Sequence, residues 1–375
     1  MVCMIIFIIG TKSEAIKFST IIREMQNREL PFKILNTGQH GEKSMIEWMK
    51  KLDLPVPNIN TGESLREVWS RKGLFGSMQV FAFWTATKMP KLISIFRKER
   101  PKVVIYQGDT IIVPLTALSA RMSGVGIQLA HRESGMRSHN FLEPIPEEIN
   151  RYIADKWITD IHFCPTPTAV KNLKEENAHG EIHYVGDPMV EIVSYILKKF
   201  PMKIEYKNYV ALSLHRFENI NDKNKMNKLV DVLDQSPFNI VFPLNLNTRR
   251  KFERYGLMKR LEAMSHIYLS DPIQYMEWVN ILKHAEAVLT DSGGMQEESQ
   301  ILRVPCILMR NLTEWVETVK SGATVLTGFD TEKILHYLND IKNKGEFYKS
   351  VKSSINLLGD GKATERIVDV LEEKI

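Results

Sequence analysis

The apolar residues of this chain gather in short, nearly continuous runs, and amphipathic stretches lie between the runs. Runs of about four to eight apolar residues bounded by turn-forming residues are typical of strands buried on both faces of a parallel sheet. The amphipathic stretches indicate helices that cover such a sheet. In the N-terminal half, strands are predicted at Val2–Ile9, Phe32–Asn36, Val103–Gln107, Gly126–His131 and Ile161–Cys164.

The same alternation begins again after the segment Ile182–Asp187. We therefore predict two Rossmann-like, doubly wound α/β domains, 1–185 and 186–358, with a hinge near Val185–Asp187. Parallel sheets of this kind bind ligands at the carboxyl ends of their strands, so the domains are expected to face a central cleft. The segment 359–375 has a helical pattern and could pack back on the first domain. Strands of the second domain are predicted at Tyr209–Leu214, Ile240–Leu244, Ile267–Leu269, Ala287–Thr290 and Pro305–Met309.

The charge and composition of the chain limit the kinds of molecule that it could bind. The net charge of +5 and the isoelectric point near 8.8 are modest, and the basic residues are dispersed over the 375 positions. This distribution argues against a nucleic-acid partner and permits a small anionic substrate. Cys3, Cys164 and Cys306 lie in apolar runs without metal-ligand spacing, which predicts buried free thiols in a reducing, cytoplasmic compartment. The apolar run at 1–9 is too short to cross a bilayer and lacks a basic leader, so no membrane association is expected.

The most informative stretch follows the strand predicted at 287–290. Ser292, Gly293 and Gly294 are expected to present unpaired backbone N–H groups at the start of a helix, where the helix dipole favours a phosphate group. A carboxylate one turn into that helix can accept hydrogen bonds from both hydroxyls of a ribose. An ordinary strand-to-helix turn is the alternative interpretation.

Two loops of the first predicted domain carry further candidates. In the glycine turn that begins at Gly10, Lys12 and Lys17 can both reach phosphate oxygens. Asp109 lies at the mouth of the next long strand, where a helix N-cap is the alternative.

Charges are denser in two later clusters. His131–Arg137 follows a strand and Pro144–Arg151 comes shortly after, which predicts a rigid catalytic loop or else a solvated ion network. In Ser213–Asn219, His215 is placed to neutralise a diphosphate, although a histidine after a strand can also be a structural hydrogen-bonding group.

Taken together and in order, these clusters resemble the motifs of the non-hydrolysing UDP-N-acetylglucosamine 2-epimerase family. That family carries G-T-R-P-E-A-I-K, G-D-T, H-V-E-A-G-L-R, P-E-E-x-N-R, H-R-x-E-N and T-D-S-G-G-x-Q-E-E, and the matching positions here run from Gly10 to Arg366. The resemblance implies the GT-B-like fold of two Rossmann domains that many nucleotide-sugar glycosyltransferases share.

The resemblance also implies a function. It predicts an isomerase that converts UDP-N-acetylglucosamine to UDP-N-acetylmannosamine for surface glycan synthesis, with no cofactor or metal, and with a possible homodimer. Lys17 and Arg151 would support the nucleotide and the carboxylate loop, and Trp278 would lie near the uracil, with a place in the core as its alternative. The implied catalytic residues are Asp109, Glu133, Glu147 and His215. The implied substrate-binding residues are Lys12, Lys17, Arg151, Trp278, Ser292, Gly293, Gly294 and Glu298, the last on the ribose.

The chain departs from the family pattern at several positions. Lys12 stands where arginine is usual, and Arg132 stands where a small apolar residue is usual. Trp315 replaces the arginine of T-E-R-P-E and resembles relatives that act on UDP-2,3-diacetamido-2,3-dideoxy-glucuronate, which is therefore the main alternative substrate. A GT-B glycosyltransferase and a non-catalytic nucleotide-sugar sensor are the alternatives from other classes.

Overall fold

The computed structural model describes the chain apart from residues 1–3, 40–41, 63–76, 111 and 141–146, and apart from the side chains of 77–85. It forms two compact units, Met1–Ile192 with Gly359–Ile375, and Val193–Leu358. The division lies within helix α8 (Met189–Lys199), later in the chain than residue 185. We describe each unit by itself.

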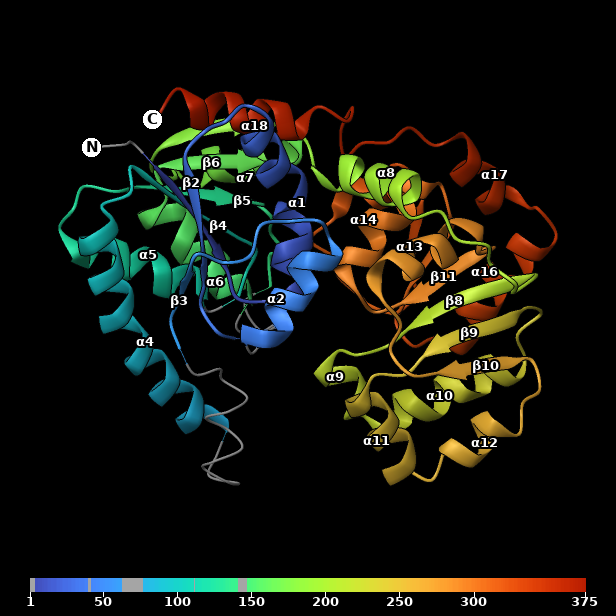
Figure 1. Ribbon diagram of the computed structural model, residues 1–375. Coiled ribbons are helices and arrows are strands. Elements are labelled where there is room, and N and C mark those ends of the chain that lie inside the picture. Colours follow the sequence, from blue (N-terminus) through green and yellow to red (C-terminus); the bar gives the residue numbers. More distant parts are fainter. Residues whose placement is uncertain (1–3, 40–41, 63–76, 111, 141–146) are drawn as a thin grey trace. The chain divides into compact units, whose positions relative to one another are not determined.

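The first unit is built on a seven-stranded sheet in the order β3-β2-β1-β4-β5-β6-β7, and neighbouring strands are parallel throughout (Figure 1). The strands are β1 (Ile5–Ile9), β2 (Phe32–Asn36), β3 (Ile59–Asn60), β4 (Val103–Gln107), β5 (Gln128–Arg132), β6 (Ile161–Cys164) and β7 (Glu181–Tyr184). The helices of this unit are α1 (Lys12–Asn27), α2 (Glu42–Lys51), α4 (Ser77–Glu99), α5 (Ile112–Ser123), α6 (Glu147–Ile153), the π-helix η1 (Ala154–Ile158), α7 (Pro167–Glu175), the first part of α8, and α18 (Ala363–Glu372).

The second unit repeats this architecture with a six-stranded parallel sheet in the order β10-β9-β8-β11-β12-β13. Its strands are β8 (Tyr209–Ser213), β9 (Asn239–Pro243), β10 (Ile267–Ser270), β11 (Ala287–Thr290), β12 (Cys306–Leu308) and β13 (Thr324–Leu326). Its helices are the rest of α8, α9 (Phe217–Ile220), α10 (Lys223–Asp234), α11 (Leu246–Arg254), α12 (Met258–Glu262), α13 (Tyr275–His284), α14 (Gly293–Leu302), α15 (Val316–Lys320), α16 (Thr331–Lys342) and α17 (Glu346–Ser353). The prediction of two parallel-sheet α/β domains is confirmed.

The central strands are apolar along their whole length because helices cover both faces of each sheet. Every residue of β1 and of β11 is buried. Three strands that the apolar pattern did not predict, β3, β7 and β13, are all edge strands. They are short and partly exposed, so their sequences lack the continuous apolar run that marks a central strand.

The topology gathers the candidate residues at one edge of each sheet. In the first unit the strand order reverses between β1 and β4, and in the second it reverses between β8 and β11. Ligands of doubly wound sheets bind beyond the carboxyl ends of the strands at such a reversal. Lys12 and Asp109 follow the ends of β1 and β4, whereas His215 and Ser292 follow the ends of β8 and β11.

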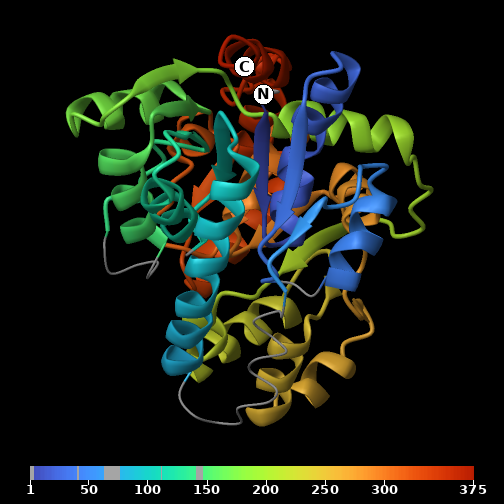
Figure 2. The ribbon, with the colours of Figure 1, turned by 60° about the vertical axis from the view of Figure 1, so that its left-hand side comes forward.

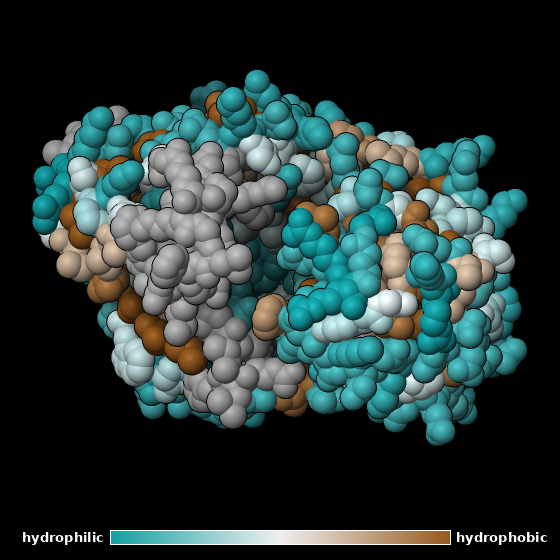
Figure 3. All heavy atoms as spheres, turned by 90° about the horizontal axis from the view of Figure 1, so that it is seen from below, coloured by the Kyte–Doolittle hydropathy of each residue, from teal (hydrophilic) through white to brown (hydrophobic). Residues whose placement is uncertain are grey.

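The last helix, α18, belongs to the first unit and packs along α1 (Figure 2). Thr364 Oγ1 lies 2.8 Å from Thr20 Oγ1, and Arg28 pairs with Asp369 at 2.6 Å. No helix in the described part of the chain is long and apolar enough to cross a membrane. The surface of the described residues seen in Figure 3 is mainly hydrophilic.

Candidate active site

Glu133 lies in a tightly constrained turn at the end of β5. Its φ angle is 70°, which is uncommon for a residue with a side chain. Two residues later, Gly135 has φ 82°, and a Cβ atom added there would lie 2.3 Å from the carbonyl oxygen of Ala169 on α7. The positive φ values and the close approach of Ala169 constrain the backbone of the turn that carries Glu133.

Cations surround the Glu133 carboxylate. Lys17 Nζ on α1 lies 2.5 Å from Oε1, and Arg132 Nη1 lies 3.4 Å from Oε2. Burial would raise the pKa of Glu133, but the charges of Lys17, Arg132 and Arg151 and the hydrogen bond from Lys17 outweigh it and lower the pKa to about 2. Glu133 is thus held as a carboxylate, and Lys17, expected to contact phosphate, is paired with it.

Helix α6 holds Asp109 from the other side. The Arg151 guanidinium pairs with Asp109 Oδ2, and Asn150 Nδ2 donates to the Asp109 carbonyl oxygen at 2.9 Å. Glu147 is the first residue of the same helix, one turn before Arg151. Glu148 instead turns back and accepts hydrogen bonds from the backbone of the loop at 138–139, at 3.0 Å each. The prolines of the predicted Pro144–Arg151 cluster lie outside the described residues.

A buried polar network that the sequence reasoning missed supports this loop pair. His131 Nδ1 lies 2.5 Å from Asp155 Oδ1, and His131 Nε2 lies 2.9 Å from the Gly108 carbonyl oxygen. Asp155 also accepts from Ser134 Oγ at 2.6 Å and from Arg137 Nη1 at 2.8 Å. Burial would raise the pKa of Asp155, but the charges of His131 and Arg137 outweigh it, so the pKa is lowered. This network joins the loops that carry Asp109 and Glu133.

Asp155 reaches this position because it lies in the π-helix η1, which directly follows α6. Short π-helical turns are frequent at functional sites. A lone aspartate in a partly apolar stretch gave no periodic signal, since a π turn follows neither the 3.6-residue nor the two-residue repeat.

The glycine turn after β1 is organised by Glu14. Its Oε2 accepts from the backbone N–H groups of Gly10 at 2.5 Å and Thr11 at 3.0 Å, and its Oε1 accepts from Thr110 Oγ1 at 3.2 Å. The N–H groups of Gly10 and Thr11 therefore already donate hydrogen bonds within the protein. Lys12 lies with its ammonium 5.3 Å from the centre of the Trp48 ring.

The glycine-rich turn of the second unit departs in one respect from expectation. The Ser292 N–H donates to Thr290 Oγ1 at 3.0 Å, so the prediction that it is unpaired is wrong. Gly293 and Gly294 begin α14, so their N–H groups have no acceptor inside the helix. A Cβ atom on Gly293 would lie 2.5 Å from Glu314 Oε1, which explains why this position has no side chain.

Asp291 ties this turn to the loop that carries His215. It is fully buried and accepts from the backbone N–H groups of His215 at 3.2 Å and Arg216 at 3.0 Å, and from Asn219 Nδ2 at 3.1 Å. The His215 imidazole is 46% exposed, with Nδ1 3.5 Å from Asp291 Oδ1. Asp291 lies in the T-D-S-G-G motif, but no role was predicted for it.

Glu298 lies further along α14 and is held by an aromatic residue. The Tyr275 hydroxyl donates to Glu298 Oε1 at 2.6 Å. Trp278, one turn after Tyr275 on α13, is 8% exposed and packs in an apolar cluster with Tyr209 and Val241. The structure therefore places Trp278 in the core of the second unit, and its role at a uracil stays a prediction.

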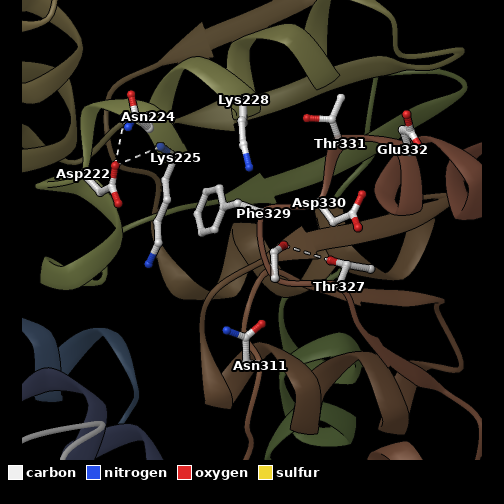
Figure 4. A pocket seen from close by; sticks show the side chains of 11 residues that line it. Asp222, Asn224, Lys225, Lys228, Asn311, Thr327, Phe329, Asp330, Thr331 and Glu332 are labelled. Atoms are coloured by element: carbon white, nitrogen blue, oxygen red, sulfur yellow. Dashed lines mark hydrogen bonds between the residues drawn. The ribbon is translucent and has the colours of Figure 1, made fainter.

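A depression of about 750 Å³ in the second unit contains none of the predicted residues (Figure 4). Lys225 and Lys228 lie beside Phe329 in its wall, and the Lys225 ammonium is 5.5 Å from the centre of that ring. Two of its carboxylates, Asp222 and Asp330, cap the first turns of α10 and α16. These side chains are used to begin helices, so the depression is lined partly by structural groups.

Comparison with known proteins agrees with this geometry. The family model described as UDP-N-acetylglucosamine 2-epimerase matches residues 23–372. A UDP-N-acetylglucosamine 2-epimerase of Methanocaldococcus jannaschii is 34% identical over 97% of each chain. A UDP-2,3-diacetamido-2,3-dideoxy-D-glucuronate 2-epimerase of Pseudomonas aeruginosa is 32% identical over 98% of this chain and 99% of its own.

Solved structures show the same similarity to UDP-N-acetylglucosamine 2-epimerases. The crystal structure of the M. jannaschii UDP-GlcNAc 2-epimerase in complex with UDP-GlcNAc and UDP superposes with a TM-score of 0.82 and 31% identity over 99% of both chains. The match of fold, the whole-length sequence similarity and the carboxylate and glycine-rich loops agree. The chain therefore belongs to the UDP-N-acetylglucosamine 2-epimerase family.

Proposed function

We propose that the protein interconverts UDP-N-acetylglucosamine and UDP-N-acetylmannosamine by elimination and re-addition of UDP, and so supplies a sugar for surface glycans. The observation that carries this proposal is the arrangement of Asp109 and Glu133 at the ends of neighbouring strands, each paired with a cation. The M. jannaschii relative of that name supports the choice of substrate.

The chemistry explains why carboxylates are needed. The proton on C2 of the sugar is not next to a carbonyl group, so its direct removal would leave an unstabilised carbanion. If the bond between C1 and the phosphate oxygen breaks first, its electron pair leaves with UDP and C1 gains oxocarbenium character. A carboxylate then takes the C2 proton and a glycal forms. Protonation of C2 from the other face and attack of UDP on C1 give the epimer.

The environments of the carboxylates suggest a division of labour. Glu133, with its pKa lowered to about 2, is a weak base, and we assign it to stabilising the positive charge at C1. Proton transfer then falls to Asp109 and Glu147. A positioned acid or base of this kind contributes about 10²- to 10⁴-fold to the rate.

The second unit would hold the nucleotide. The N–H groups at the start of α14 and the exposed His215 imidazole are proposed to receive the diphosphate, since a helix N-terminus favours anions. Glu298 is proposed to accept the ribose hydroxyls, with Tyr275 fixing its orientation. That these groups and the carboxylates of the first unit act on one molecule is part of the proposal.

A second candidate substrate is UDP-2,3-diacetamido-2,3-dideoxy-glucuronate. The P. aeruginosa relative with this specificity is almost as similar as the M. jannaschii protein. Trp315, which motivated this alternative, is buried, and its Cδ1 would lie 3.6 Å from a Cβ atom on Gly293 at the glycine-rich turn. The elimination chemistry is the same for both substrates.

The cysteines support the proposed compartment. Cys164 and Cys306 are buried free thiols, and burial raises the pKa of Cys306 to about 12, so neither is poised for disulfide exchange. Cys3 lies outside the described residues. We propose a cytoplasmic protein, and a homodimer that sedimentation analysis would detect.

The experiment is proton NMR of the anomeric signals in deuterated water, with each nucleotide sugar in turn. We expect UDP-N-acetylglucosamine to give its epimer, with deuterium incorporated at C2. An epimer that keeps its C2 hydrogen over many turnovers would contradict elimination. If only the diacetamido-glucuronate nucleotide reacts, the second candidate is the substrate.

The carboxylate assignment has a matched control in the same unit. Lys33 and Glu99 form another lysine–glutamate pair at 2.5 Å, away from the candidate site. Glu133→Gln should lower turnover by about 10² or more, and Glu99→Gln should leave it within a few-fold of the parent. Equal turnover in the two variants would remove Glu133 from the mechanism.

A further inference from the structure

Arg132 is the least expected residue of the candidate site, and it is almost completely buried. It is 1% exposed, among the largest fully buried side chains of the protein. A guanidinium at this depth needs compensating partners, because an arginine cannot be deprotonated in a protein. The partners that it has indicate what it does.

Those partners lie on three different elements of the first unit. Nη2 donates to Asp187 Oδ1 at 2.6 Å, in the segment after β7. Nη1 donates to Gln107 Oε1 at 3.0 Å, at the end of β4, and lies 3.4 Å from Glu133 Oε2. The guanidinium therefore lies beside Glu133 Oε2, whereas Lys17 contacts Oε1.

Asp187 serves as the anchor of this arrangement. It is fully buried and accepts from the Met189 N–H at 3.0 Å as well as from Arg132. Among the described residues, its Oδ2 atom has no hydrogen-bond partner. Burial raises the pKa of Asp187 against the opposing charge of Arg132. Asp187 thus compensates the buried charge of Arg132, and it is itself 0% exposed.

We propose that Arg132, anchored by Asp187, is a positioning residue that fixes the orientation and the negative charge of Glu133 for the epimerisation reaction. This inference rests on the proposed function. Arg132 acts through Glu133 and does not touch substrate. Its burial therefore argues against a role in binding the carboxylate of a uronate substrate.

Charged side chains on several surrounding elements act on Glu133. Lys17 on α1, Arg132 on β5 and Arg151 on α6 lower the pKa of Glu133, and they act against burial. Asp187 is the nearby group of like charge; burial raises the pKa of Asp187, and the charge of Glu133 adds to that rise. Removing Arg132 and the charge of Asp187 together leaves Lys17 and Arg151 to hold the carboxylate, so its pKa is expected to rise.

The test is the double variant Arg132→Met with Asp187→Asn, because the single change Arg132→Met would leave a buried carboxylate without its partner. We expect the acid limb of the kcat profile to move up by about one pH unit or more. At pH 6, where Glu133 is still ionised, we expect kcat to fall about tenfold or more because the carboxylate is no longer held in its orientation, while the Kd of UDP stays unchanged. Arg132→Lys, which keeps the charge without the planar fork, should fall between the parent and the double variant.

A control variant and a second measurement distinguish failure of the proposed function from failure of the proposed role of Arg132. Arg121→Met removes a more exposed arginine that pairs with Asp160 at 2.6 Å in the same unit, and it should leave the pH profile unchanged. Carbon-13 NMR of labelled glutamate carboxyls, assigned with Glu133→Gln, reports the titration of Glu133 without any turnover. A parent enzyme that turns over neither substrate would overturn the proposed function. A folded double variant with parental kcat profile and parental Glu133 titration would overturn the role of Arg132.

Discussion

At the scale of single residues, the polar side chains near the site hold parts of the backbone as well as one another. Glu14 is the clearest case, because it joins the turn after β1 to Thr110, the neighbour of Asp109. It is 4% exposed. Burial raises the pKa of Glu14 to about 7, against the hydrogen bonds from Gly10, Thr11 and Thr110 that lower it.

This pKa predicts a pH dependence of stability. Since the pKa of Glu14 in the folded protein lies above its ordinary value of 4.5, the stability that protonated Glu14 contributes is fully present below about pH 4.5 and is lost as the pH rises through about 7. Glu14→Gln keeps the shape and the acceptor oxygen for the Gly10 and Thr11 N–H groups, places an amide donor toward the Thr110 hydroxyl, which can accept, and cannot ionise. Between pH 5 and 8 the parent should therefore lose about 2–3 kcal/mol of unfolding free energy relative to Glu14→Gln.

Urea denaturation of both proteins at several pH values across that window measures the difference. The comparison with Glu14→Gln cancels the other titrating groups, including His162, whose pKa is lowered by burial. Two stability curves that run parallel from pH 5 to 8 would show that Glu14 is ionised at neutral pH in the folded protein.

The sequence identified the residue types of the site better than their pairings. Asp109, Glu133 and His215 lie where strand ends and motifs placed them. The partnership of Lys17 with Glu133 spans 116 positions, and no local pattern reports such a contact. The same is true of Asp155, since a buried acid that serves other side chains has no periodicity of its own.

At the scale of elements, α14 shows how a helix start is shaped by what packs against it. Glu314, which meets the Gly293 position, is buried and pairs with Arg310 at 3.0 Å, so it cannot move aside easily. The adjacent Gly294 has more room. The nearest atom to a Cβ added there is Ser292 Oγ at 4.0 Å.

Substitution by alanine should therefore change the unfolding free energy differently at the two glycines. Gly293→Ala forces overpacking against Glu314 and should lower the unfolding free energy by about 1–3 kcal/mol. Gly294→Ala should be neutral or raise it by up to about 1 kcal/mol, because alanine is the better helix former. Urea unfolding without UDP measures both, and equal destabilisation by the two changes would contradict the packing argument.

The central strands could be predicted individually, because a strand that is buried on both faces has apolar residues at consecutive positions. The prediction Ile161–Cys164 coincides with β6, and Ala287–Thr290 coincides with β11. Edge strand β7 was not predicted, since it is short and both of its end residues are exposed; the predicted hinge near Val185–Asp187 begins directly after it. The π-helix η1 had no counterpart among the predicted elements.

At the scale of the whole molecule, the first unit is discontinuous in sequence, and α18 returns to complete it. Leu371 on α18 and Leu338 on α16 of the second unit are both 0% exposed. The same substitution, leucine to alanine, can therefore be made at a buried position in each unit. Leucine to alanine at such sites costs about 2–5 kcal/mol.

Calorimetry should separate the two units. Leu371→Ala is expected to lower the melting temperature of the first unit, and Leu338→Ala that of the second. Added UDP should raise only the transition that Leu338→Ala lowers, because a ligand stabilises the unit that binds it. A UDP-dependent shift of the transition sensitive to Leu371→Ala would place the nucleotide seat in the first unit.

The buried pair of Arg132 and Asp187 also has a consequence for the ancestry of this chain. Either residue alone would leave a charge in the core, and breaking such a pair costs about 3–5 kcal/mol. An ancestor with a small apolar residue at 132 could not acquire the arginine first without that loss. Acquiring Asp187 first would carry the same loss, so a simultaneous or compensated change at both positions is favoured, and once both were present neither could revert alone. The two positions are then inherited as a unit, 55 residues apart.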